Sequence, residues 1–212
     1  EVPDALGAAT LALADDCVFG GTVTGSGSLI KSGAGALTVT GVGDATGALT
    51  VSGGACGVAG GGRITTGPVN VLADATLFGH GQVGGPVNVA SNAWLQGGTA
   101  AACGTLAVGG DLTLALGASI AWRYADGGAS DTITVAGTVN MPTNGLVQVA
   151  SLTPGLMPPA KRLLIASSTE INGPDDLSGW IIEGAENASL RYSDDRTKIY
   201  FFTPRGSLLL LK

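Results

Sequence analysis

The string that comes nearest to a cofactor motif is G-H-G-Q-V-G, residues 79–84, which has the G-x-G-x-x-G spacing of dinucleotide-binding loops. Such a loop follows a strand and opens a helix that holds the pyrophosphate, and an acidic residue about 20 positions later binds the ribose. Here another strand pattern begins at Pro86, and no acidic residue lies between Asp74 and Asp111. We therefore interpret the string as a glycine-rich corner and expect no nucleotide or other cofactor.

His80 is the only histidine in the chain. A Ser-His-Asp or Cys-His catalytic group would have to use it, and so would a histidine-based metal site. It lies between two glycines in an expected turn, where nothing in the sequence orients its second ring nitrogen. We predict that His80 is a solvated turn residue without a catalytic or metal-binding role.

Carboxylates are the stronger candidates for catalysis. Glycoside cleavage needs two or three carboxylates about 5–9 Å apart, one with a raised pKa, and a calcium-dependent reaction needs an acidic cluster. The acids within the central part of the chain are Asp74, Asp111, Asp126 and Asp131. Asp74 falls in an expected turn and Asp131 begins an expected strand, so these two do not share a face. The sequence predicts no catalytic residues and no metal site.

Trp94 is the candidate ligand contact, because an exposed aromatic ring can stack on a sugar. It precedes the apolar Leu95 in an expected strand, and the alternation of a strand turns Trp94 away from the side that Leu95 faces. Trp94 is the one aromatic residue that we expect to be partly exposed. Burial at a corner or against a neighbouring segment is the alternative, and the more common fate of a tryptophan.

The elements that must position these residues repeat along the chain. Five segments share a Gly, apolar residues two and four places on, a small or turn-forming residue at seven, and Ala or Gly at eight. They begin at Gly47, Gly67, Gly85, Gly110 and Gly137. The starts lie 20, 18, 25 and 27 residues apart, a period typical of solenoids, whose single coils cannot bury their apolar face alone. The chain is therefore predicted to be a stack of coils.

Within each repeat, the residues two and four places after the Gly share one face of a strand. Val87 and Val89 should line a common interior, whereas Asn88 should point outward. The turn that follows needs residues that tolerate a left-handed backbone. These residues are Gly54, Asp74, Asn92, Gly117 and Asn144.

Short strands, no convincing amphipathic helical window and starts about 20 residues apart fit an all-β protein, a parallel β-helix with about three faces per coil. An antiparallel sandwich is the structural alternative, and it would predict hairpins every 8–12 residues or so.

The composition changes near residue 150. From Ser151 onward the chain holds 14 of its 26 charged residues and five of its ten aromatic residues, but only five of its 36 glycines. Strands are expected at residues 162–166, 180–182, 189–192 and 198–202. We divide the chain into a β-helix repeat region, 1–150, and a C-terminal β cap, 151–212, since a solenoid must cover its last apolar layer and its open edge.

Composition excludes several partners. The net charge of −6, with basic residues that do not cluster, argues against nucleic acid and anionic membranes. Polar residues interrupt every apolar run, so no membrane span is expected. Cys17, Cys56 and Cys103 lack zinc-site spacing and are interpreted as small buried residues, with a disulfide between neighbouring coils as the alternative.

A family resemblance begins at residues 27–41, G-S-L-I-K-S-G-A-G-A-L-T-V-T-G. This segment is similar to the passenger-associated transport repeat of bacterial autotransporters, in which a Lys-x-Gly-x-Gly-x-Leu core recurs. The residues that match this core are Lys31, Gly33, Gly35 and Leu37. Residues 77–89, 104–114 and 130–139 resemble, in order, the coils that follow such repeats. Residues 151–212 resemble, more weakly, the C-terminal passenger portion that caps the helix and assists its folding, an autochaperone-like segment.

The resemblance implies a right-handed, single-stranded parallel β-helix that is exported and lies outside the cell or at the bacterial cell surface, associated with the outer membrane. Two features depart from the family. T-A-A-A-C, residues 99–103, replaces the usual Pro-Gly, and no outer-membrane barrel sequence follows Lys212.

We therefore expect a non-enzymatic, monomeric extracellular stalk or adhesin-type passenger segment, whose partners are host or cell-surface glycans or proteins. A polysaccharide-degrading β-helix is the first alternative. Lys31 and Arg63 are the only basic residues before Arg123. The repeat region therefore offers few basic residues for the combined acid and base site that such an enzyme needs. A module that binds glycans through Trp94 is the second alternative.

Overall fold

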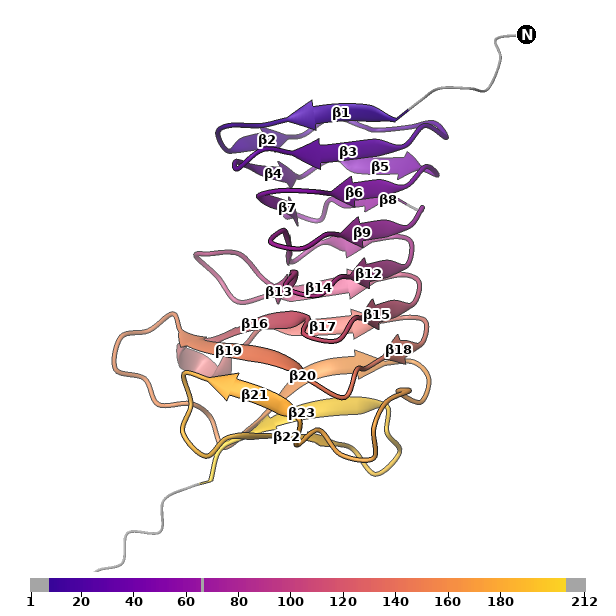
Figure 1. The fold of residues 1–212 in the computed structure, drawn as a ribbon. Coiled ribbons are helices and arrows are strands. Elements are labelled where there is room, and N and C mark those ends of the chain that lie inside the picture. Colours follow the sequence, from indigo (N-terminus) through magenta and orange to yellow (C-terminus); the bar gives the residue numbers. More distant parts are fainter. Residues whose placement is uncertain (1–7, 66, 205–212) are drawn as a thin grey trace, which may run out of the picture.

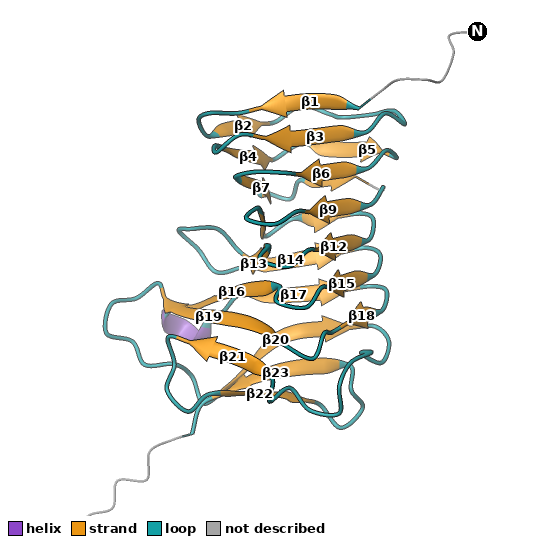
Figure 2. Cartoon of the chain, in the orientation of Figure 1, coloured by secondary structure: helices purple, strands orange, loops and turns teal. Residues whose placement is uncertain are grey.

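The computed structural model describes residues 8–65 and 67–204, which form an all-β fold with one short 3₁₀ turn, η1 (Asp126–Gly128). The chain runs through three sheets in a fixed order, A, B and C, and then returns to sheet A one strand farther along. Figure 1 shows the resulting stack, in which the colours change steadily from one end to the other. Loops join one sheet to the next at the corners of each coil (Figure 2).

Each sheet grows by one strand per coil. Sheet A contains β1 (Ala9–Ala12), β3 (Leu29–Ser32), β6 (Leu49–Val51), β9 (Val69–Val71), β12 (Val87–Val89), β15 (Leu112–Leu114) and β18 (Val139–Asn140). Sheet B contains β2 (Cys17–Phe19), β4 (Ala36–Val39), β7 (Ala55–Val58), β10 (Thr76–Gly79), β13 (Trp94–Gly97), β16 (Ser119–Tyr124), β19 (Gly145–Ser151) and β21 (Trp180–Glu183). Sheet C contains β5 (Val42–Ala45), β8 (Arg63–Thr65), β11 (Gln82–Val83), β14 (Thr105–Val108), β17 (Thr132–Val135), β20 (Lys161–Ser167), β23 (Lys198–Phe202) and β22 (Ser189–Tyr192).

The strands of neighbouring coils pair in parallel and in register, so equivalent residues lie one above another. In sheet A, Asn88 pairs with Asn70 of the preceding coil and with Thr113 of the next. The side chains of the first two residues are joined by a 3.0 Å hydrogen bond from Asn88 Nδ2 to Asn70 Oδ1. The predicted parallel pairing is confirmed, and the antiparallel sandwich is excluded for the repeat region.

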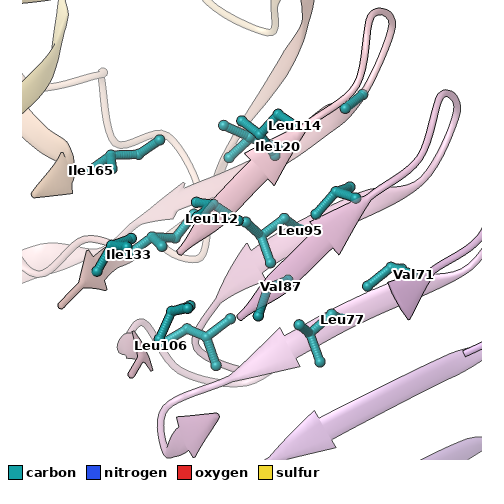
Figure 3. Packing of buried hydrophobic residues seen from close by; sticks show 14 of the residues in the cluster. Val71, Leu77, Val87, Leu95, Leu106, Leu112, Leu114, Ile120, Ile133 and Ile165 are labelled. Atoms are coloured by element: carbon teal, nitrogen blue, oxygen red, sulfur yellow. The ribbon is translucent and has the colours of Figure 1, made fainter. Parts of the chain in front are cut away.

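Alternate residues of most strands between β3 and β19 fill one continuous apolar core. Val87 and Val89 are buried, as predicted, whereas Asn88 is exposed between them. Figure 3 shows aliphatic side chains from successive coils packed in rows along this core, among them Leu77, Leu95 and Ile120. Such stacking buries the face that a single coil leaves open.

Four of the five predicted left-handed corners are confirmed: the φ angles are positive at Gly54, Asp74, Asn92 and Gly117. Asn144 is the exception, and that prediction is wrong. Its side chain instead bonds the preceding coil, since Gly117 N donates to Asn144 Oδ1 at 3.1 Å.

Lys31 in β3 is fully buried, and its ammonium group lies among backbone carbonyls. Lys31 Nζ donates to the carbonyl oxygens of Gly33 at 2.9 Å and Gly53 at 2.7 Å, and also to that of Gly35. Gly33 has a φ of +80°, and a Cβ there would collide with the carbonyl oxygen of Leu13 in the preceding coil. The Lys-x-Gly-x-Gly core therefore forms a corner that only glycine fits, and the lysine bonds carbonyls that this corner leaves without strand partners.

The C-terminal segment first adds one more coil and then reverses direction. β20 and β21 extend sheets C and B in parallel, and Asn172 forms a parallel bridge to Asn140 of sheet A. β23 then pairs antiparallel with both β20 and β22. The four strands expected after residue 150 are all present. The division of the chain at residue 150 remains a prediction.

The first described coil, by contrast, is exposed. All residues of β1 and β2 are exposed, and β1, β2 and β5 are the outermost strands of their sheets. A cavity behind them is lined almost wholly by apolar side chains, including Leu29, Leu37 and Ile64. The five sequence repeats did not include this coil or the one after it, because neither carries the full pattern of Gly, apolar and turn-forming residues at the repeat's spacing.

The cysteines occupy three different environments, and none is paired. Cys56 is buried as predicted, and burial raises the pKa of its thiol to about 12. Cys17 is exposed and Cys103 is half-buried, so the prediction of burial is wrong for Cys17. Leu37 lies between Cys17 and Cys56 in the sheet B register, which separates these two thiols by two coils.

Candidate ligand-binding face

The outer face of sheet B carries the candidate ligand contact, Trp94. In β13 the inward residue is Leu95, which is fully buried, so Trp94 and Gln96 on either side of it point outward. Trp94 is partly exposed, as the sequence predicts, but the prediction that it is the one such aromatic residue is wrong, because Phe19 is 37% exposed and Phe78 is partly exposed too. Its role as a ligand contact remains a prediction.

Trp94 lines a shallow groove that crosses four successive coils, from β10 to β19. Its other lining residues are Thr76, Gln96, Ala121 and Gln148. The register explains the hollow, because Ala121 stands directly between Gln96 and Gln148 and its methyl group leaves a gap between their longer side chains.

Phe78 was missed as an exposed aromatic, although it follows the same alternation. It lies next to the buried Leu77 in β10, points outward and is partly exposed, and it pairs with Gln96 of the next coil in the register. Its ring lies over Gly57 of β7, where a Cβ would collide with it. The glycine thus provides the space in which the ring lies flat on the sheet.

One edge of this face is fixed by a buried ion pair that the sequence did not reveal. Arg123 Nε donates to Asp131 Oδ2 at 2.8 Å, and both residues are buried. Arg123 also donates from Nη2 to the carbonyl oxygen of Gly97 at 2.8 Å and from Nη1 to that of Thr99. Gly104 N donates to Asp131 Oδ1 at 3.1 Å. The pair therefore holds both ends of the segment 98–104, which contains the T-A-A-A-C departure.

Burial dominates the electrostatics of this pair. Desolvation raises the pKa of Asp131 to about 6, although Arg123 and two backbone amides favour the carboxylate. The same burial raises the pKa of the nearby Cys103 thiol, with the charge of Asp131 adding to it. The available signal was the spacing of Arg123 and Asp131 around η1, where Tyr124 and Ser130 form an antiparallel bridge.

The glycine-rich string and His80 lie at a corner, as predicted. β10 ends at Gly79 and β11 begins at Gln82, so two strands flank the turn and no helix follows it. His80 is exposed. The geometry required to hold a pyrophosphate at a helix N-terminus is therefore absent there.

The structure does not assemble the acids of the repeat region into one site. Asp74, Asp111 and Asp126 are exposed, and Asp111 Oδ1 accepts a hydrogen bond from Thr138 N at 2.7 Å. Residues 8–65 and 67–204 contain no group of three or more His, Cys, Asp or Glu side chains that could hold a metal ion. None of these described residues belongs to a helix with the length and apolar character needed to cross a bilayer.

No protein-family model matches this sequence, and no curated protein is significantly similar to it.

Proposed function

We propose that the chain is a right-handed, single-stranded parallel β-helix that serves as an extended, non-enzymatic stalk or adhesin-type segment. The observation that carries this proposal is the parallel pairing of strands from successive coils in all three sheets, with an unbroken register in sheets A and B. Right-handedness is supported by the strong preference for that hand wherever a chain crosses over between parallel strands.

The buried charged groups favour a structural role over catalysis. Lys31 donates hydrogen bonds to backbone carbonyls of the corner. Arg123 and Asp131 form an ion pair, and both bond the segment 98–104 or the residue before it. A catalytic acid or base must reach substrate, whereas these three residues are buried and already bonded.

A location outside the bacterial cell or at its surface is proposed from the resemblance of residues 27–41 to autotransporter passenger repeats. The corner that Lys31, Gly33 and Gly35 form supplies a physical reason for that motif to recur in a solenoid. The outer face of sheet A carries a row of uncharged side chains in register, Asn70, Asn88 and Thr113. Such a face suits a segment that serves as an extended spacer.

Coil duplication tests the proposal. Residues 67–84 form one 18-residue coil, and Gly85, Pro86 and Val87 repeat its first three residues. Three extra copies inserted before Gly85 should preserve the register and lengthen the rod by about 14 Å, at about 4.8 Å per coil. Small-angle X-ray scattering would measure the length, and circular dichroism the strand content.

The matched control inserts three copies of residues 67–75, which amount to half a coil each. These insertions place outward residues in inward positions and should reduce the folded fraction. An unchanged maximum dimension in the full-coil variant, with its strand content retained, would contradict the stalk proposal.

A further inference from the structure

The groove on sheet B has polar groups that are left free for a ligand. Neither Gln96 nor Gln148 makes a side-chain hydrogen bond within residues 8–65 and 67–204, and both side chains reach solvent. The indole N–H of Trp94 also bonds none of these residues. By contrast, Trp122 Nε1 donates to the carbonyl oxygen of Asp131 at 2.8 Å, and Trp180 Nε1 to that of Pro142 at 3.2 Å.

The groove carries no charge. Its five lining residues are an aromatic ring, two amides, a hydroxyl and a methyl group. Arg123 is the one cation that the strand β16 turns to this side, and its guanidinium group is covered and bonded to Asp131, Gly97 and Thr99. An anionic ligand would therefore find no free positive partner in the groove, whereas a neutral ligand does not need one in order to bind.

An exposed aromatic ring beside unpaired amides matches one ligand chemistry. A sugar ring presents C–H groups on its faces, which pack on an aromatic ring, and hydroxyls at its edge, which both donate and accept hydrogen bonds. An amide side chain can serve both roles toward such hydroxyls. A peptide of similar size would bring backbone groups that need strand partners, and the strands on both sides of the groove are already paired.

We propose that the groove lined by Trp94, Gln96, Ala121 and Gln148 binds a neutral oligosaccharide. One sugar ring packs on Trp94, its neighbour lies over the methyl group of Ala121, and the amides of Gln96 and Gln148 bond the hydroxyls on either side. This binding goes beyond the stalk role, because a solenoid that only extends needs no such groove.

Isothermal titration calorimetry with four defined probes tests the proposal. The neutral probes are hexasaccharides of β-1,4-glucose, β-1,4-mannose and β-1,4-N-acetylglucosamine, and the anionic comparison is hexagalacturonate. We expect at least one neutral probe to bind and hexagalacturonate not to bind. Trp94→Ala should weaken binding about tenfold or more, and Gln96→Ala or Gln148→Ala about threefold to tenfold each.

Asn88→Ala and Thr113→Ala, which alter the outer face of sheet A, are the matched controls and should leave the affinity unchanged. Trp94→Phe should retain most of it, because a ring remains. Circular dichroism must show that each variant is folded as the parent is.

Three results would overturn the proposal: no neutral probe binds, Trp94→Ala binds as tightly as the parent, or only hexagalacturonate binds. Self-association that Trp94→Ala abolishes, without any sugar binding, would also overturn it and assign this face to a second copy of the chain. Each of these outcomes is independent of the coil-duplication result, so the stalk proposal can stand or fall separately.

Discussion

Within residues 8–65 and 67–204, the two ends of the stack are covered to different degrees. At the C-terminal end, β23 reverses direction and places Phe201 against Trp122, with 4.6 Å between the ring centroids and no exposure of Phe201. At the N-terminal end, β1 and β2 are exposed along their length, and Val18 is 71% exposed. A repeat can therefore propagate a core, but a different strand arrangement is needed to close it.

Removing the closing strands should have the largest effect. A chain that stops after Glu183 lacks β22 and β23, which exposes Trp122 and leaves β20 as an unpaired edge. We expect aggregation or loss of the folded monomer, measured by light scattering after size exclusion and by circular dichroism.

The comparison for that truncation is a chain that begins at Gly21 and so lacks β1 and β2. Their residues are exposed, and we expect a folded monomer with only a small loss of stability. If both truncations caused the same loss of folded monomer, the two ends would not differ in their importance for folding.

Alanine substitutions of one phenylalanine at each end compare the packing of the two ends at the level of single side chains. Phe201→Ala should lower the free energy of unfolding by about 3–5 kcal/mol, because it opens a cavity beside Trp122 in the closed end. Phe19→Ala, at a site that is 37% exposed, should cost about 1 kcal/mol or less. Urea unfolding followed by circular dichroism measures both, and similar losses would show that the first coil is packed as firmly as the last.

The buried Asp131 predicts a pH dependence. Its folded pKa of about 6 lies above the ordinary value of 3.8, so the folded state holds the proton more tightly than the unfolded chain does. This contribution is fully present below pH 3.8 and is lost as the pH rises through about 6, and it is worth on the order of 3 kcal/mol. Asp131→Asn should remove this slope from the stability measured between pH 4 and 7.

Lys31, nearer the open end, predicts a slope of the opposite sign. Desolvation lowers the pKa of Lys31 from 10.5, although Cys56 and Asp16 oppose the shift. The folded state therefore releases this proton more readily, so stability should rise with pH across the alkaline range below 10.5. Lys31→Met should abolish that rise without altering the slope from Asp131. If Asp131→Asn and Lys31→Met both removed the same pH dependence of stability, a group other than these two would be titrating.

The smallest effects are expected at exposed positions of either end. Val18→Thr in the first coil and Ile181→Thr in the last replace side chains that are 71% and 63% exposed. Each should change the free energy of unfolding by about 0.5 kcal/mol or less, because little buried surface is lost. A large effect of either substitution would show that this side chain packs against the fold more closely than its exposure indicates.

The sequence predicted what local alternation controls. The inward positions of Val87 and Val89, the outward position of Trp94 and the strands after residue 150 follow from a period of two and from spacing alone. The same rule applied to Leu77 would have placed Phe78 outward. Four of the corners were predictable because few residue types tolerate a left-handed backbone.

The remaining features depend on contacts between distant residues. Arg123 is buried at an outward strand position only because the segment 98–104 folds back over it, and nothing in the local pattern indicates that cover. The groove likewise depends on the register that brings Gln96, Ala121 and Gln148 together from three coils. Asn144 does not adopt the left-handed backbone, and its side chain accepts a hydrogen bond from Gly117 N of the preceding coil, a contact that the local sequence pattern does not indicate.

The placement of the aromatic residues makes intrinsic fluorescence a probe of only part of the rod. All three tryptophans and all three tyrosines lie at or after Trp94, and Trp122 and Trp180 are buried toward the closed end. Fraying that starts in the first coils would thus leave the emission spectrum unchanged while it reduces the circular dichroism signal. A difference in midpoint between the melting curves measured by circular dichroism and by fluorescence would show that the first coils unfold before the rest of the solenoid does.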